Sequence, residues 1–280
     1  MISLDQQIEI LTVNPVMATD RTTQLRKVIK NHTLRVESLD VYIEKQHILK
    51  DINLTIPEKS ITCIIGPSGC GKSTFLKTLN RMHDETPEVR ISGKVFVDDE
   101  NIYDKNINVI DTRKKMGLLA QRPCPLPMSI FDNVAYGPRI HGTRKRKAIN
   151  QTVIKYLQYV GLWDEVRGRI RSSANRLSIG QQQRLCLARG LAIEPEYILG
   201  DEATSALDPL STKIIEELFI KLKDKYTVIL VTHTLRQAKR IADHIVFMYL
   251  GQIIETGTTE EFFSNPKQKL TRDYLSGSFS

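Results

Sequence analysis

Short apolar runs alternate with amphipathic stretches along most of the sequence. The run at residues 60–65 is largely apolar and ends at Gly66-Pro67, which predicts a buried strand stopped by a turn. Residues 72–82 follow with apolar positions at helical spacing. The same strand-then-helix order returns at 197–199 and 212–222, and again at 227–231 and 235–242. This alternation predicts an α/β fold with a mainly parallel sheet and right-handed crossovers.

Three regions depart from this rhythm. Residues 34–36, 39–43 and 48–56 carry apolar residues at alternating positions and predict short strands. Residues about 129–175 have apolar positions close to helical spacing, so this region is expected to be mainly helical. Residues 1–32 are polar, mixed in charge and weakly patterned, and we expect a flexible extension there, followed by one domain over 33–280.

Composition is that of a soluble globular protein. Of the 280 residues, 41% are apolar and 26% charged, and no apolar run approaches the roughly 18 residues of a membrane-spanning helix. The net charge is +8, but the one dense basic run, at 144–147, lacks interleaved aromatic residues, so we expect no nucleic-acid partner. The N-terminus lacks a secretory signal pattern, and the four cysteines show no pairing or metal-ligand spacing, which predicts a protein of the reducing cytosol.

A glycine-rich segment, here called the phosphate cradle, follows the strand expected at 60–65. It fits G-x-x-x-x-G-K-[ST] in full, and its glycines let backbone N–H groups curl round an anion at the start of a helix. Lys72 would reach the β- and γ-phosphates of a nucleotide, and the Ser73 hydroxyl would ligate Mg²⁺. The cradle comprises Gly66, Pro67, Ser68, Gly69, Cys70, Gly71, Lys72, Ser73 and Thr74.

Two carboxylates supply candidate chemistry for the bound nucleotide. The apolar strand expected at 197–199 continues into Asp201-Glu202. The first carboxylate can hold Mg²⁺ through water, and the second can polarise an attacking water as general base. A lone histidine, His233, follows the strand expected at 227–231. Each feature alone is more often structural, but after a phosphate cradle and in this order they predict hydrolysis.

These segments together resemble the ATP-binding-cassette (ABC) ATPases from about residue 33 to the C-terminus. In order, the chain has the cradle, Gln121, the signature segment Leu177-Ser-Ile-Gly-Gln-Gln-Gln-Arg184, Asp201-Glu202, the segment 205–208, and His233. The resemblance implies a P-loop ATPase fold whose core sheet is mainly parallel. It also implies an N-terminal antiparallel β subdomain and an inserted helical lobe at about 123–190.

The resemblance also implies roles for individual residues. Gln121 would sense Mg²⁺ and the attacking water, Glu202 would be the base, and His233 would hold the γ-phosphate. A homodimer would bind two ATP molecules, each between the cradle of one subunit and the signature segment of the other. The implied contacts from that second subunit are Ser178, Gly180 and Gln181, with Asp208 at the dimer interface.

Four positions depart from the family pattern. Ile179 stands where a second glycine is usual, Gly200 replaces a bulky apolar residue, and Ala203 replaces a proline. The aromatic residue that stacks on adenine is also displaced, since Tyr42 lies one position before its usual place, which Ile43 occupies. These changes could lower turnover, because a β-branched residue such as Ile179 restricts the backbone beside the phosphate.

Within the family, the chain resembles the ATP-binding subunits of phosphate importers. The resemblance lies in residues 121–137, 205–212, 247–251 and 271–277. It implies two transmembrane permease subunits, a solute-binding protein reached through them, and a peripheral place on the cytoplasmic face of the membrane. Three alternatives are an importer of another oxyanion or of an amino acid, a non-transport ABC ATPase of DNA repair or ribosomes, and a nucleotide-binding regulator with impaired hydrolysis.

Overall fold

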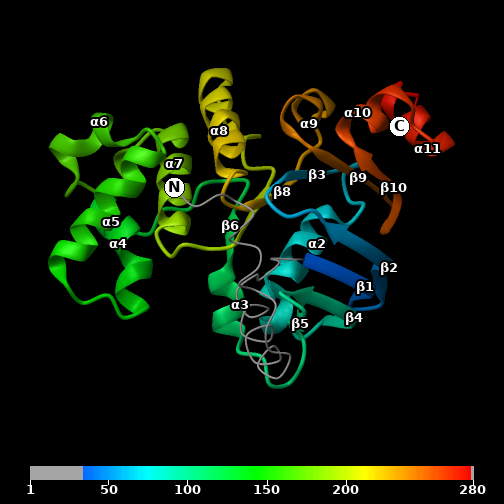
Figure 1. Ribbon diagram of the computed structural model, residues 1–280, viewed down its shortest axis with the longest axis horizontal. Helices are drawn as coiled ribbons and strands as arrows, with labels where there is room; N and C mark the ends of the chain where they lie inside the picture. The colour runs from blue at the N-terminus through cyan, green and yellow to red at the C-terminus, as the bar shows by residue number, and fades with distance from the viewer. Residues whose placement is uncertain (1–33, 279–280) are drawn as a thin grey trace, which may run out of the picture. The chain divides into compact units, whose positions relative to one another are not determined.

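The computed structural model describes residues 34–278, which contain two β-sheets and the helices that pack on them (Figure 1). The smaller sheet is antiparallel, with strand order β2-β1-β4-β5. Its strands are β1 (Leu34–Ile43), β2 (Gln46–Ile56), β4 (Val89–Val97) and β5 (Glu100–Asn101). The extension predicted over residues 1–32 lies outside the described residues.

The larger sheet has strand order β10-β9-β3-β8-β7-β6, and only β10 runs antiparallel to its neighbour. Its strands are β3 (Ile61–Ile65), β6 (Met116–Leu119), β7 (Tyr197–Asp201), β8 (Thr227–Val231), β9 (His244–Tyr249) and β10 (Gln252–Thr258). The predicted α/β class and mainly parallel core sheet are confirmed.

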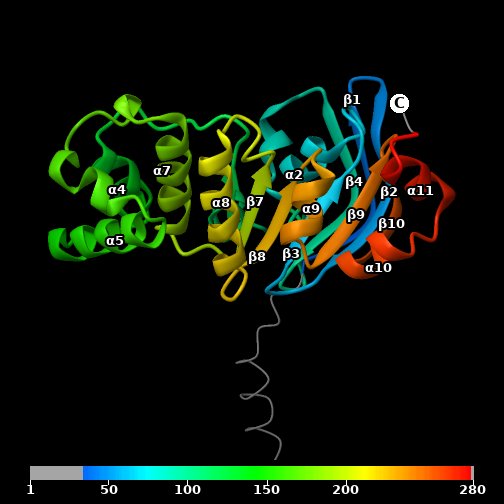
Figure 2. The same ribbon diagram turned by 90° about the horizontal axis from the view of Figure 1, so that it is seen from above.

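Helices cover both faces of the larger sheet. Helix α2 (Lys72–Leu79) lies between the two sheets, whereas α8 and α9 lie on the opposite face (Figures 1 and 2). The remaining helices are α3 (Val109–Lys115), α4 (Ile130–Ile140), α5 (Arg146–Tyr159), α6 (Trp163–Val166), α7 (Ile179–Leu191), α8 (Pro209–Leu222), α9 (Leu235–Ile241), α10 (Thr259–Ser264) and α11 (Lys269–Leu275). Short 3-10 turns occupy Met82–Glu85, Arg167–Arg169 and Ala174–Arg176. Among residues 34–278, no helix has the length and apolar character needed to span a bilayer.

Strand β3 explains why the sequence places an apolar run before the cradle. All five of its residues are buried. Ile61, Cys63 and Ile65 belong to the core shared with α8 and α9, and Ile64 belongs to the core shared with α2. Because successive side chains point to opposite faces of a sheet, a strand covered on both faces is apolar at nearly every position, and Thr62 is the one polar residue of β3. The strand thus fixes the start of the cradle rigidly.

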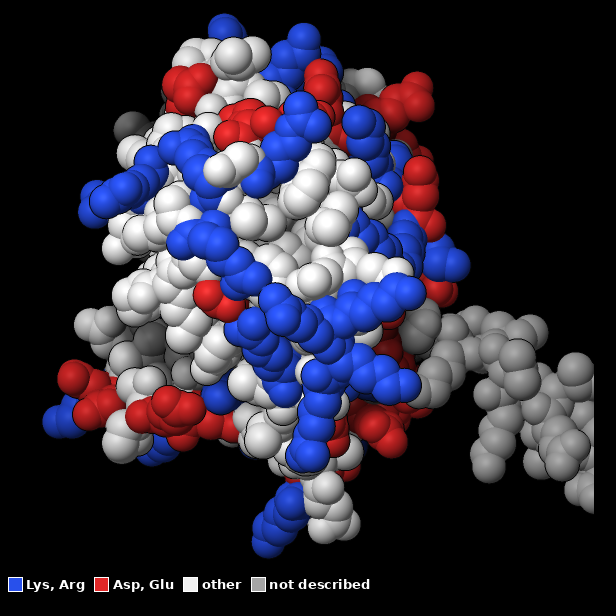
Figure 3. All heavy atoms as spheres, turned by 90° about the vertical axis from the view of Figure 1, so that its left-hand side faces the viewer, with Lys and Arg blue, Asp and Glu red and all other residues white. Residues whose placement is uncertain are grey.

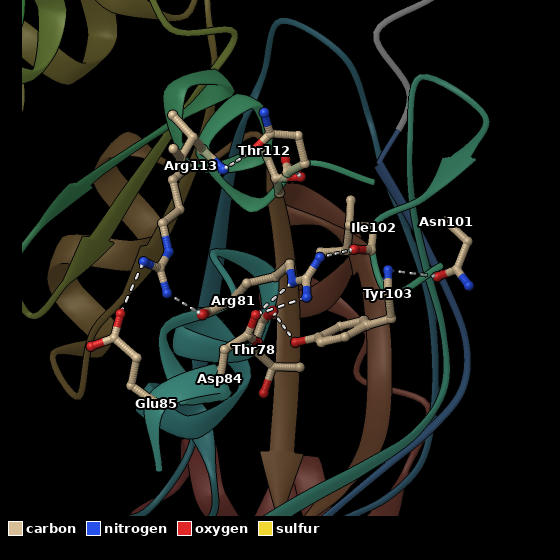
Figure 4. Close-up of polar contacts among 11 residues, drawn as sticks. Thr78, Arg81, Asp84, Glu85, Asn101, Ile102, Tyr103, Thr112 and Arg113 are labelled. Carbon is tan, nitrogen blue, oxygen red and sulfur yellow. Dashed lines mark hydrogen bonds and ion pairs between the residues drawn. The ribbon is translucent and has the colours of Figure 1, made fainter. Parts of the chain in front are cut away.

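Helix α2 ends earlier than the prediction of 72–82, and polar contacts join its end to residues 102 and 103, which follow β5 (Figure 4). Arg81 has a φ of 53°, a left-handed backbone that cannot continue a helix. Its guanidinium donates to Asp84 at 2.9 Å and to the carbonyl of Ile102 at 2.7 Å. The Tyr103 hydroxyl donates to the carbonyl of Thr78 at 2.7 Å. The helix that carries Lys72 and Ser73 is therefore anchored at its far end.

Helices α4, α5, α6 and α7 form a group beside the β6 edge of the larger sheet (Figures 1 and 2). Ser129 begins α4 by accepting from the N–H of Asp132, and Pro138 lies inside this helix. Apolar side chains of these helices, including Val134, Val153 and Leu185, share one buried cluster. The largely helical character expected for residues 129–175 is confirmed.

Candidate active site

The cradle is shaped by close backbone approaches that only glycine permits. A Cβ atom on Gly66, whose φ is 149°, would lie 2.1 Å from the carbonyl oxygen of Met248 in β9. Gly71 has a φ of 105°, and a Cβ there would lie 2.7 Å from a methyl group of Leu49. Gly66 is therefore required by space as well as by backbone conformation, and Gly71 is favoured by its backbone conformation.

Helix α2 begins at the cradle without a side-chain cap and without an acidic residue in its first turn. The first turn of a helix has N–H groups with no partner in the helix, and its dipole favours negative charge. An anion placed in the cradle would meet these groups, as the sequence predicts for a nucleotide phosphate.

The Lys72 side chain is folded back over the cradle. It is only 6% exposed, and its Nζ donates to the carbonyls of Gly66 and Pro67, each at 2.8 Å. Cys70 lies beneath, with its Sγ 3.8 Å from the same ammonium. Burial raises the pKa of the Cys70 thiol, although the nearby ammonium opposes this. The ammonium is thus held over the segment where a phosphate would bind.

The predicted pair of carboxylates, Asp201-Glu202, lies directly beside the cradle. The Ser73 hydroxyl donates to Oδ1 of Asp201 at 2.7 Å. Glu202 is next in the chain, and two side chains approach its Oε2. Gln121 donates to this oxygen from Nε2 at 3.2 Å, and Nδ1 of His233 lies 3.2 Å from it. Glu202 therefore joins the predicted glutamine and histidine.

The parallel sheet explains why these residues meet. Leu119 of β6 is paired with Gly200 of β7, and Asp201 is paired with Val231 of β8. Gln121 and His233 each follow the end of their strand by two residues. Because the carboxyl ends of parallel strands lie along one edge of the sheet, their side chains converge there with the cradle after β3.

The signature segment lies on a different element and caps its own helix. Ser178 begins α7 by accepting from the N–H of Gln181, and Gln181 accepts in return from the N–H of Ser178. A Cβ on Gly180 would lie 2.3 Å from the hydroxyl of Ser211, so glycine is needed where α7 meets α8. Within residues 34–278, no hydrogen bond joins this segment to the cradle.

Asp208 and Tyr42 have partners within the chain. Asp208 caps α8 by accepting from the N–H groups of Leu210 and Ser211, each at 3.0 Å. Its hydrogen bond with Ser211 lowers the pKa of its carboxyl. The Tyr42 ring is stacked on His47, with ring centroids 4.1 Å apart. Adenine stacking by Tyr42 stays a prediction.

Two of the departures from the family pattern, Gly200 and Ile179, have local explanations. A side chain at Gly200 would lie 2.6 Å from a methyl group of Leu230 on the adjacent strand, so this glycine makes room for a neighbour. Ala203 is buried. Ile179 is 54% exposed at the first position of α7, where its side chain is directed away from the core.

A buried polar network behind the site had no recognisable pattern in the sequence. Gln237 of α9 accepts from the Thr232 hydroxyl at 2.8 Å, and donates to the Thr204 hydroxyl at 2.8 Å and to Glu216 at 3.0 Å. Glu216 is 4% exposed and accepts two bonds from Arg240. The network connects the segment after Glu202 with the segment before His233.

A family model described as ABC transporter matches residues 49–205, more than half of the chain, from β2 through the cradle to the segment after Glu202. The chain belongs to the ABC transporter family. The resemblance drawn from the sequence motifs is confirmed, and this ABC protein is an ATPase.

Similar proteins cover nearly the whole of the ABC ATPase. Phosphate import ATP-binding protein PstB 1 of Bacillus licheniformis is 51% identical over 245 residues, covering 88% of this chain and 95% of that protein. PstB 3 of Streptococcus pneumoniae serotype 4 is also 51% identical, over 247 residues, covering 88% of this chain and 99% of that protein. The structure of cbiO1 from Clostridium perfringens, part of the ABC transporter complex cbiONQ, matches with a TM-score of 0.73 and 26% identity. The match covers 87% of this chain and 95% of that one.

Proposed function

We propose that this ABC ATPase powers the uptake of inorganic phosphate across the cytoplasmic membrane, from the cytoplasmic face. The solute assignment rests on the two relatives at 51% identity that are named phosphate import ATP-binding proteins. The ATPase mechanism rests on one observation, the convergence of Gln121 and His233 on Oε2 of Glu202 beside the cradle.

In this mechanism the cradle binds the ATP phosphates. Lys72 exchanges its bonds to the carbonyls of Gly66 and Pro67 for bonds to the β- and γ-phosphates, while the N–H groups at the start of α2 stabilise their charge. Glu202 accepts a proton from water as its oxygen bonds to the γ-phosphorus, while the bond from that phosphorus to the β–γ bridging oxygen breaks and ADP leaves with that oxygen. Gln121 orients that water, and His233 hydrogen-bonds the γ-phosphate as charge develops.

The residues beside the cradle fit Mg²⁺. The Ser73 hydroxyl and the Asp201 carboxylate lie 2.7 Å apart, and Mg²⁺ prefers oxygen ligands, usually one or two from the protein beside substrate phosphates. Ser73 and Asp201 would hold the ion, with Gln121 near it. When bound, Mg²⁺ would neutralise charge on the phosphate oxygens.

Each active site is completed by a second copy of the chain. Ser178, Gly180 and Gln181 of one copy would contact the γ-phosphate in the cradle of the other, with Asp208 near the shared interface. The cradle leads into α2 and the signature segment into α7, so the two lie on separate elements of one chain. Glu202→Gln should bind ATP without hydrolysing it and accumulate as a dimer in ATP and Mg²⁺. A Glu202→Gln protein that elutes only as a monomer under those conditions would refute the composite site.

We further propose that the group α4–α7 is the inserted lobe, at about residues 123–190, and that it receives the permease. A cavity of about 520 Å³ opens on this group, on a face where Lys and Arg side chains gather (Figure 3). It is lined by Phe131, Arg139, Thr143, Arg144, Arg146, Ile149, Asn150 and Arg171. A lining with four arginines and one aromatic ring suits a cytoplasmic segment of a permease subunit that carries carboxylates.

Uptake of labelled phosphate tests the solute. In cells that lack the protein, wild type should restore uptake and Glu202→Gln should not. If wild-type protein hydrolyses ATP but leaves phosphate uptake unchanged, the solute assignment fails and the ATPase assignment stands.

A further inference from the structure

A buried glutamine in α7 reaches the two loops that carry candidate catalytic residues. Gln183 has no exposed surface. Its Nε2 donates to the carbonyl of Ala120 at 3.1 Å and to the carbonyl of Ala203 at 2.8 Å. Ala120 immediately precedes Gln121, and Ala203 immediately follows Glu202. A single amide group therefore joins the loops whose side chains meet at Oε2 of Glu202.

The orientation of this amide follows from its neighbours. Both neighbouring atoms are carbonyl oxygens, which only accept hydrogen bonds, so the NH₂ group must face them. An apolar side chain of the same size would fill the space and supply neither donor. Position 183 thus provides two hydrogen bonds that packing alone does not require.

The adjacent glutamines make different contacts. Gln181 bonds to the start of its own helix and to Glu165, and Gln182 donates to the carbonyl of Leu177. These bonds stay within the helical group and the signature segment. Of the three consecutive glutamines, only Gln183 reaches the ends of β6 and β7.

We propose that Gln183 is a positioning residue for ATP hydrolysis. Its two hydrogen bonds fix the positions of the loops that carry Gln121 and Glu202 relative to α7. The proposal rests on the ATPase mechanism above. Because α7 begins at the signature segment, any movement of this helix when a second copy binds displaces both carbonyls together. The Gln121–Glu202 separation of 3.2 Å then depends on the position of α7. Displacements of about 1 Å in an active site can lower turnover a hundredfold.

The test is the substitution Gln183→Met, which keeps the side-chain length and removes both donors. We expect kcat for ATP hydrolysis by the purified full-length protein to fall about tenfold to a hundredfold. The KM for ATP should stay within about threefold, because Gln183 bonds to no cradle residue. If Gln183→Met does not fold, Gln183→Asn, which withdraws the donors by one methylene, carries the same expectation.

Asn133 offers a matched control. It also has no exposed surface, and its amide donates to two carbonyls, those of Leu126 at 3.1 Å and Ser129 at 2.9 Å, away from Glu202. Asn133→Leu should lower thermal stability at least as much as Gln183→Met, and leave the kcat of the folded protein unchanged. Equal kcat losses in the two variants would overturn the proposal, because both would then reflect general damage.

A double-mutant cycle supplies a readout that a purely structural role would not change. If Gln183 acts through Gln121, the variant Gln121→Ala with Gln183→Met should have nearly the kcat of the worse single variant. If the fold losses in kcat of the two single variants multiply in the double variant, the proposal is overturned. An unchanged kcat in Gln183→Met would overturn it as well. If the wild-type protein does not hydrolyse ATP, the ATPase mechanism itself is refuted, which is a separate result from failure of the Gln183 proposal.

Discussion

The ion pair between Glu216 and Arg240 allows a sharp test of how the network behind the active site is stabilised. Arg240 donates to both carboxylate oxygens of Glu216, from Nε at 2.9 Å and from a terminal nitrogen at 2.6 Å. The Glu216 side chain is 5% exposed and that of Arg240 is 57% exposed. Arg240→Ala would therefore leave a buried carboxylate whose remaining donor is the neutral amide of Gln237 at 3.0 Å.

The size of the effect follows from this asymmetry. Removing one partner of a fully buried pair costs about 3–5 kcal/mol, because the other charge stays buried without compensation. Arg240 is more than half exposed, so water screens the pair and can approach the carboxylate once the arginine is gone. We therefore expect Arg240→Ala to lower the free energy of unfolding by about 2 kcal/mol.

Equilibrium urea unfolding, followed by circular dichroism, measures this loss. Arg236→Ala on the same helix is the control, and it should change the free energy by less than about 0.5 kcal/mol because Arg236 is exposed. Adding Glu216→Gln to Arg240→Ala should recover part of the stability, because a buried amide costs less than a buried charge. A double variant less stable than Arg240→Ala alone would refute the reasoning from a stranded charge.

Three further predictions concern the site and its surroundings. Ile179→Gly should raise kcat for ATP hydrolysis, and should lower the free energy of unfolding by up to about 1 kcal/mol because glycine is a poor helix former in the first turn of α7. An unchanged kcat in steady-state ATPase assays would mean that the exposed isoleucine is tolerated. The exposed thiol of Cys124 should react with N-ethylmaleimide before that of Cys70, because burial raises the pKa of the Cys70 thiol. ATP with Mg²⁺ should protect Cys70 from the reagent. Mass spectrometry of labelled peptides measures both effects. Burial alone would raise the pKa of the Glu255 carboxyl, but the nearby Thr271 hydroxyl and hydrogen bonds from the N–H groups of Lys267 and Gln268 lower it below 4.5 overall. The ionised Glu255 carboxylate therefore stabilises the folded protein above about pH 4.5, and this contribution is lost as the pH falls through the folded-state pKa. Glu255→Gln should flatten the acid part of a plot of unfolding free energy, measured with urea, against pH.

The sequence predicts those parts of the site whose residue type is dictated locally. Gly66 and Gly71 are identifiable because their backbones, with φ of 149° and 105°, favour glycine, and Lys72 follows them at fixed spacing. Glu202 is identifiable because it directly follows an apolar strand. The parallel order of the strands then brings Glu202 to Gln121 and His233, which lie far away in sequence.

Other features depend on packing that leaves no periodic signal. Gln237 and Glu216 are 21 residues apart on two helices, and nothing in either segment marks them as partners. The family pattern predicts adenine stacking for Tyr42 from its position in the chain, whereas its ring in the structure contacts His47 of the adjacent strand. Arg81 ends α2 through a left-handed backbone that arginine rarely adopts, so apolar spacing alone extends the helix too far.

The backbone at Glu202 has a φ of 48°, in the left-handed region that glycine and asparagine enter more readily than glutamate. Holding a glutamate there costs about 1 kcal/mol or more. Selection for stability alone would therefore replace this residue with glycine. The resulting protein would be more stable but inactive, because it would lack the proposed general base. Random libraries of this chain screened for heat resistance should accumulate such losses, so thermostable variants are best recovered under simultaneous selection for transport.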